Sequence, residues 1–250
     1  MPELNHDPIF VAVIIASLGF LIGLTKGGFN ALGSLLTPVL SLVLPVSLAV
    51  GVLLPMLIVG DALALYIYRG QWDSRLVWRM LPAGMVGAVI GAVLLVQLPA
   101  NALRVVLGVF VLMIVAYKLI GDRVTHLAYR PRQWHAPVIG AVTGLTSGMF
   151  NNGGPAFNSY LLLLQLPSQT FIATSVLFFA LINLIKLPSF LIAGVLNIPL
   201  LLSLWWVYLF IPVGLWAARR LLLRVNQRVF ERVIIVLLVA SSLLLFVQSR

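Results

Sequence analysis

Two glycine-rich segments place polar side chains inside the hydrophobic part of this chain. The first runs from Gly19 to Asn30 and the second from Gly140 to Asn151. Five residues of the first recur in the second at a constant offset: Gly19, Gly23, Leu24, Thr25 and Gly27. Each segment interrupts an apolar stretch that is too short to cross a bilayer comfortably. Paired breaks at matching places in two halves of a membrane protein are a strong sequence indication of a transport site.

The chemistry that such breaks support is anion binding. A helix that begins after a bend directs free N–H groups and a positive dipole end at whatever lies there. The sequence predicts two such starts after the bends, one at Ala31 and one at Pro155. Pro155 is well suited to its position, because proline fits the first turn of a helix. Irregular backbone at membrane depth is tolerated only inside protein or beside a wet cavity. The alternative is that the glycines serve only close helix–helix contacts.

The residues predicted to bind the anion supply backbone N–H groups, uncharged side chains and one cation. They are Thr25, Lys26, Gly27, Gly28, Asn30, Ser147, Asn151, Asn152, Gly153 and Gly154. A charge at the bilayer centre costs about 2.5–3.5 kcal/mol on insertion scales, which an anion or an acidic partner of Lys26 would offset. Alternatively, Lys26 snorkels to water from the end of a short segment.

Asp61 and Asn183 are predicted to contribute to coupling. Asp61 is the only acid well inside a hydrophobic stretch, so it is a candidate proton carrier or a counter-ion for Lys26. A structural hydrogen bond near a helix end is the alternative. Asn183 is its counterpart in the second half and is suited to a neutral hydrogen bond. Lys186 lies near the end of its stretch and is expected to snorkel.

Composition indicates an all-α polytopic membrane protein. Apolar residues make up 62% of the chain and charged residues 9%, whereas soluble domains average about 25% charged residues. The alternating segments of a membrane β-barrel are absent. The net charge of +10 does not indicate a nucleic-acid partner, because the basic residues lie between the apolar stretches. With no cysteine, no metal-ligand spacing and no catalytic or nucleotide-binding motif, the chain is predicted to hold no metal or cofactor and not to be an enzyme.

About eight membrane helices are expected, or eight to ten segments if short hairpin helices are included. The full-length candidates are 46–68, 76–98, 101–121, 199–218 and 229–247, and 168–186 is adequate. Four short stretches form two hairpins, at 9–24 with 31–44 and at 136–149 with 155–166.

The distribution of charge predicts how the chain crosses the membrane. Three connections, 69–79, 118–132 and 219–232, are rich in arginine and lysine, whereas those near 45, 98–101 and 187–198 contain neither. The positive-inside rule places the basic connections in the cytoplasm and both termini outside the inner (plasma) membrane.

The same charge distribution gives the two halves opposite orientations. The first half then begins outside and the second begins inside, which defines an inverted-topology repeat. The predicted parts are a first repeat at 1–121, a cytoplasmic linker at 122–135 and a second repeat at 136–250.

The two motifs resemble those of the sulfite exporter TauE/SafE family. The similarity lies in Gly23–Gly28 leading to Leu36–Leu40, and in Gly144–Pro155, and it extends over roughly 10–248. Phe29–Ala31 departs from the glycine-richer first bend that is more usual in this family. The resemblance implies a multi-pass inner-membrane transporter with about eight helices. Members are associated with sulfite, sulfonates and other small sulfur-containing or organic anions.

The predicted function is therefore secondary transport of a small anion, such as sulfite, an organosulfonate or a related organic anion. Alternating access is expected to come from rocking one half against the other. An anion channel and a non-transporting structural membrane subunit remain alternatives. Besides the small anion and the lipid bilayer, a homo-oligomeric partner is left open. The sequence does not determine the substrate, the direction, the coupling ion or whether the hairpins cross fully.

Overall fold

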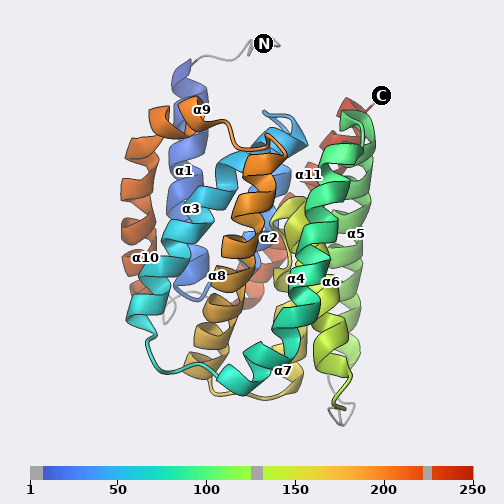
Figure 1. Ribbon diagram of the computed structural model, residues 1–250. Helices are drawn as coiled ribbons and strands as arrows, with labels where there is room; N and C mark the ends of the chain where they lie inside the picture. The colour runs from blue at the N-terminus through green and yellow to red at the C-terminus, as the bar shows by residue number, and fades with distance from the viewer. Residues whose placement is uncertain (1–7, 125–131, 222–226, 250) are drawn as a thin grey trace.

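The computed structural model describes residues 8–124, 132–221 and 227–249, and all regular secondary structure in them is helical. Figure 1 shows the helices side by side in one bundle. They are α1 (Pro8–Lys26), η1 (Asn30–Leu32), α2 (Gly33–Ser41), α3 (Val46–Ile67), α4 (Ser74–Gln97), α5 (Ala100–Val124), α6 (His135–Phe150), α7 (Gly154–Leu163), α8 (Ser168–Ile192), α9 (Ile198–Ser203), η2 (Trp205–Leu209), α10 (Phe210–Leu221) and α11 (Gln227–Gln248).

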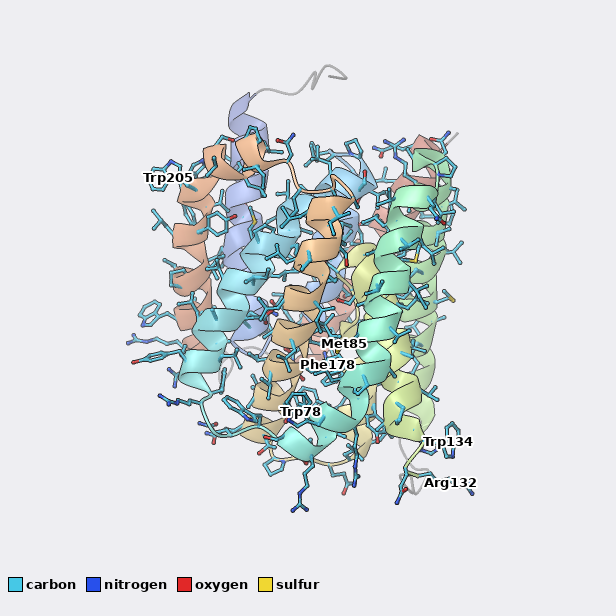
Figure 2. All side chains as sticks on the ribbon, viewed as in Figure 1. Trp78, Met85, Arg132, Trp134, Phe178 and Trp205 are labelled. Carbon is cyan, nitrogen blue, oxygen red and sulfur yellow. The ribbon has the colours of Figure 1, made fainter. Side chains whose placement is uncertain are left out.

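Five described helices are long and apolar enough to cross a membrane, which confirms the predicted class. Their spans are Val46–Ile67, Ser74–Gln97, Ala100–Leu119, Ser168–Ile192 and Val229–Gln248. Large apolar side chains stay exposed on their outer faces, as lipid contact requires. Exposed tryptophans lie towards both ends of the bundle, with Trp205 near one end and Trp78 and Trp134 near the other (Figure 2). This placement suits an aromatic belt.

The prediction of one continuous span at 199–218 is wrong. The segment is divided into α9, η2 and α10. Asn197 caps α9 by accepting from the backbone N–H of Leu200 at 3.1 Å. Pro212 then lies in the first turn of α10, a position where the missing N–H leaves no unmade helix bond.

The two halves share local structure at matching positions. Pro45 caps α3 with φ −53° and ψ 141°, and Pro167 caps α8 with φ −53° and ψ 142°. Asp73 and Asn197 then cap the next helix of each half through their side chains. Figure 1 shows α1 starting at the upper end and α6 at the lower end, while α3 descends and α8 ascends. Matched helices with opposite directions are the arrangement of an inverted repeat.

The hairpin helices α2 and α7 reach only partway through the bundle. They contain 9 and 10 residues, which corresponds to about 14–15 Å at 1.5 Å per residue, half of a typical ~30 Å hydrocarbon core. The chain therefore bends inside the bundle and returns towards the end from which it entered (Figure 1). The two bends approach from opposite ends.

Glycines pack α6 of the second half against α4 of the first half, and α1 of the first half against α10 of the second half. A Cβ atom on Gly144 of α6 would lie 2.0 Å from the carbonyl oxygen of Gly84 on α4. A Cβ on Gly23 of α1 would lie 2.1 Å from the carbonyl oxygen of Ile211 on α10. Because no side chain fits in these contacts, the backbones pack directly against each other. The two halves are therefore interleaved rather than packed as separate bodies.

The described parts of two basic connections lie at the same end of the bundle. The α3–α4 connection and Arg132, just before α6, lie at the lower end in Figures 1 and 2. The α4–α5 and α8–α9 connections lie at the opposite end. Of the predicted linker 122–135, residues 125–131 lie outside the described residues, and so do residues 222–226 of the third basic connection.

Candidate functional site

The two bends reverse the direction of the chain with different backbone conformations. In the first, α1 ends at Lys26 and Gly28 takes φ +127°, a value that glycine alone adopts readily. In the second, α6 ends with Asn151 in the left-handed conformation at φ 52°, which asparagine tolerates better than most residues. The helices after the bends begin at Asn30 and Gly154, close to the predicted starts at Ala31 and Pro155.

One cavity of about 70 Å³ lies between the bends, several times the ~10–15 Å³ that a single water needs. Seven predicted site residues line it: Thr25, Lys26, Asn30, Ser147, Asn151, Asn152 and Gly154. The predicted coupling residue Asn183 also lines it. Asn30 and Gly154, the first residues of η1 and α7, both lie in its wall. The structure thus brings two helix starts, one from each half, to a single cavity.

Three predicted site glycines do not line the cavity. A Cβ on Gly27 would lie 2.3 Å from the Cβ of Ala218, so this residue belongs to the contact between α1 and α10. Gly28 forms the turn itself. Gly153 packs against Thr143, whose carbonyl oxygen would lie 2.6 Å from an added Cβ. Gly28 and Gly153 therefore shape the bends and Gly27 packs two helices together, whereas the prediction assigned all three to anion binding.

Asp61 is the counter-ion of Lys26. The Lys26 ammonium group donates to Asp61 Oδ1, and Asn183 Nδ2 donates to Oδ2 over 2.7 Å. Asp61 is 1% exposed and does not line the cavity, but both of its partners do. The carboxylate therefore joins α1, α3 and α8 directly behind the cavity wall. Lys26 was predicted either to have an anion or acidic partner or to snorkel to water. The structure shows the acidic partner, and the Lys26 side chain is only 11% exposed.

The expectation that Lys186 snorkels to water is wrong. Lys186 is 1% exposed and turns inward from α8. Its Nζ donates to Asn151 Oδ1 at 2.7 Å and to both the carbonyl oxygen and Oγ of Ser147 at 3.1 Å. Three acceptors near the end of α6 satisfy the three N–H groups of the lysine, so the side chain has no need to reach water.

The second bend is tied to the first half of the chain by its asparagines. Asn151 Nδ2 donates to the carbonyl oxygen of Val50 at 2.8 Å. Asn152 Nδ2 donates to the carbonyl oxygen of Ser34 at 3.1 Å. Buried amides with fixed partners hold the cavity wall in one geometry.

The sequence interpretation missed several residues of the cavity wall. They are Gly33, Leu36, Leu57, Asn158, Ser175, Val176 and Phe179. Ser175, Phe179 and Asn183 follow one another at intervals of four on α8, so they share one helix face. Asn158 lies one turn after Gly154 on α7, and its Oδ1 accepts from Ser175 at 3.3 Å. The four-residue spacing is the signal that would have identified this face.

Comparison with known proteins matches nearly the whole chain to one family. The family model described as Sulfite exporter TauE/SafE matches residues 15–245, which include both bends and every residue of the cavity wall. No curated protein and no solved structure matches the chain.

Proposed function

We propose that this chain, which belongs to the TauE/SafE sulfite exporter family, is a secondary transporter that carries a small anion through the cavity between its bends. Membership in the family makes the chain a multi-pass membrane transporter. The observation that carries the finer proposal is the convergence of two helix starts and a ring of amide and hydroxyl side chains on one cavity.

The wall of the cavity suits an oxyanion that must also be released. Asparagine side chains and the first residues of η1 and α7 offer neutral hydrogen-bond donors. Lys26 adds a cation whose charge Asp61 already balances. Neutral donors bind an anion without the deep energy well of an unshielded ion pair, which favours turnover. Sulfite, an organosulfonate or a related organic anion fits this chemistry.

Alternating access in this fold requires moving units other than the two sequence halves. Glycine contacts join α1 to α10 and α6 to α4, and each contact pairs helices from opposite halves. Rocking one half against the other would separate these backbones. We therefore replace that expectation with two interleaved units, one built on α1 and α10 and the other on α4 and α6. The cavity is lined by α1, α6, α7 and α8 together with residues of α2 and α3, so relative movement of the units would open it.

Asp61 is the proposed coupling residue. It is the one acid among the buried residues that the structure describes, and it contacts Lys26 and Asn183 of the cavity wall. Protonation of Asp61 would release the Lys26 ammonium group to an anion in the cavity. Proton binding and anion binding would then be linked through one side chain. We place the basic end of the bundle in the cytoplasm and both termini outside, by the positive-inside rule.

A thermal-unfolding screen of the purified protein against sodium salts of small anions tests anion binding. A ligand that binds the folded state raises its stability in proportion to RT ln(1 + [L]/Kd). We expect sulfite or an organosulfonate to raise the unfolding midpoint in a saturable manner. Choline salts of the same anions are the control. If the midpoint follows the cation instead, the anion proposal is wrong.

Flux in proteoliposomes distinguishes a carrier from a channel or a structural subunit. In a carrier, unlabelled anion on the far side of the membrane accelerates the uptake of labelled anion, because the two exchange. In a channel, unlabelled anion on the far side does not accelerate this uptake. A structural subunit shows no flux of anion at all. Substitution of Asn30 or Asn152 by alanine would then leave the flux measurement unchanged.

A further inference from the structure

Two asparagines of the cavity wall hold their amide nitrogens against acceptors of the protein itself. Asn152 Nδ2 donates to the carbonyl oxygen of Ser34 at 3.1 Å, and Asn183 Nδ2 donates to the Asp61 carboxylate at 2.7 Å. Both asparagines line the cavity. A carbonyl or carboxylate oxygen only accepts hydrogen bonds, so the nitrogen of each amide, and not its oxygen, must face it. The oxygens are therefore the ends of these amides that have no such contact.

The oxygen of Asn152 lacks a hydrogen-bond partner altogether. Asn152 is 2% exposed, and no group among the described residues donates to its buried Oδ1. A buried acceptor without a partner has lost the hydrogen bonds that water would give it, and such atoms are uncommon in folded proteins. Because Asn152 is part of the cavity wall, a molecule bound there can supply the missing donor.

The cavity wall thus has two kinds of polar surface. Asn30 and Gly154 begin helices, where free N–H groups suit the negative end of a ligand. Thr25, by contrast, donates its only hydroxyl proton to the carbonyl oxygen of Ile22 at 2.7 Å, so it joins the two amide oxygens as an acceptor. An anion whose oxygens only accept can satisfy the helix starts, but it leaves these acceptors without a donor.

We propose that the substrate is an oxyanion that also carries at least one uncharged hydroxyl group, which donates to Asn152. The charged end of the molecule would lie at the two helix starts, and its hydroxyl would give the Asn152 oxygen the partner that it lacks. An uncharged donor meets this need without adding a further charge to a buried site inside the membrane. This inference rests on the proposed anion site and specifies a second functional group on its substrate.

The test compares two sulfonates of equal charge and closely similar size, isethionate (hydroxyethanesulfonate) and propanesulfonate, on the purified full-length protein. The first carries a hydroxyl group where the second carries a methyl group. Titration calorimetry at constant ionic strength gives both affinities. We expect isethionate to bind about tenfold or more tightly, because a site that hydrogen bonds a hydroxyl rejects an analogue that leaves its polar groups unpaired.

The possible results separate this inference from the proposed function. Equal affinity, or tighter binding of propanesulfonate, would overturn the inference and leave the anion site intact. If neither sulfonate binds but sulfite does, the inference is again wrong while the anion site stands. If neither sulfonate nor sulfite binds, the proposed function is wrong as well.

Variants then assign the preference to the acceptors of the wall. Asn152→Leu keeps the approximate size of the side chain without its oxygen, so the preference for isethionate should disappear. Thr25→Val exchanges a hydroxyl for a methyl group and should reduce the preference. This variant is expected to fold, because the bond from Thr25 to Ile22 lies within α1.

Asn158→Leu is the matched control. Asn158 also lines the cavity, but its Oδ1 already accepts from Ser175 at 3.3 Å. Its replacement should therefore lower both affinities and leave the preference for isethionate in place. A preference that Asn152→Leu leaves unchanged would overturn the assignment to this residue. If Asn152→Leu does not fold, an unchanged preference in Thr25→Val would overturn the assignment to the acceptors of the wall.

Discussion

Asp61 and Asn183, which the sequence predicts to be counterparts in two repeats, are hydrogen bonded to each other, with 2.7 Å between Asp61 Oδ2 and Asn183 Nδ2. They lie 122 positions apart in the chain, on α3 and α8. A contact between equivalent residues is expected only near the axis that relates two repeats. The pair therefore supports the proposed repeat and places Asp61, the proposed coupling residue, near its axis.

Removal of either partner of the Lys26–Asp61 pair should destabilise the protein more than removal of both. Lys26→Gln leaves the buried carboxylate of Asp61 without its ammonium partner. Asp61→Asn leaves the ammonium group of Lys26 without its carboxylate partner. Breaking a buried pair costs about 3–5 kcal/mol, because one charge stays buried and uncompensated. We expect the double variant to have a higher thermal unfolding midpoint than either single variant. Arg69→Gln, at an exposed position, is the control and should leave the midpoint unchanged.

Asp61→Asn should separate anion movement from proton movement. The amide can still accept from Lys26 and contact Asn183, but it cannot take up a proton. In proteoliposomes, we expect a pH gradient to lose its effect on anion uptake while exchange of anion for anion continues. Uptake that still responds to the pH gradient in this variant would remove Asp61 from the coupling mechanism.

Two glycine substitutions should separate anion binding from stability, because one glycine lines the cavity and the other lies in a helix–helix contact. Gly33 begins α2 with φ −55° and lines the cavity, and an added Cβ would lie 3.9 Å from Thr25 Cγ2. Gly33→Ala should therefore keep or raise the unfolding free energy, by up to about 0.5–1 kcal/mol, while it weakens anion binding by narrowing the cavity. Gly144→Ala should cost about 1–3 kcal/mol by forcing α6 away from α4. Thermal unfolding and anion titration of both variants check this. A Gly144→Ala variant as stable as wild type would contradict the direct backbone contact.

Distances between spin labels should reveal which helices move together. The chain contains no cysteine, so pairs of introduced cysteines can be labelled uniquely. Exposed positions are Ser17 on α1, Val213 on α10, Val86 on α4 and Val138 on α6. On saturation with anion, we expect the distances Ser17–Val213 and Val86–Val138 to stay constant and the distance Val86–Val213 to change. A change within either of the first two pairs would show that the interleaved units are not rigid.

The sequence by itself determined the class of the protein and the chemistry of its bends. Hydropathy identifies membrane segments because the bilayer imposes the same length and polarity on every span. The duplicated glycine motifs identified the bends, since the residues that break a helix act on the backbone next to them. The polar residues predicted from those motifs lie in or beside the bends, and most of them therefore line the cavity between the bends.

Tertiary structure alone decided what each buried charge contacts and what each glycine does. Lys186 is buried because Ser147 and Asn151 reach it from another helix, 39 and 35 positions away. Gly27 and Gly33 lie in the same short stretch of sequence, yet one packs against α10 and the other lines the cavity. Hydropathy and helical period are local properties of the chain. The energy of a buried lysine and the space beside a glycine depend on distant segments, and only the packed fold brings those together.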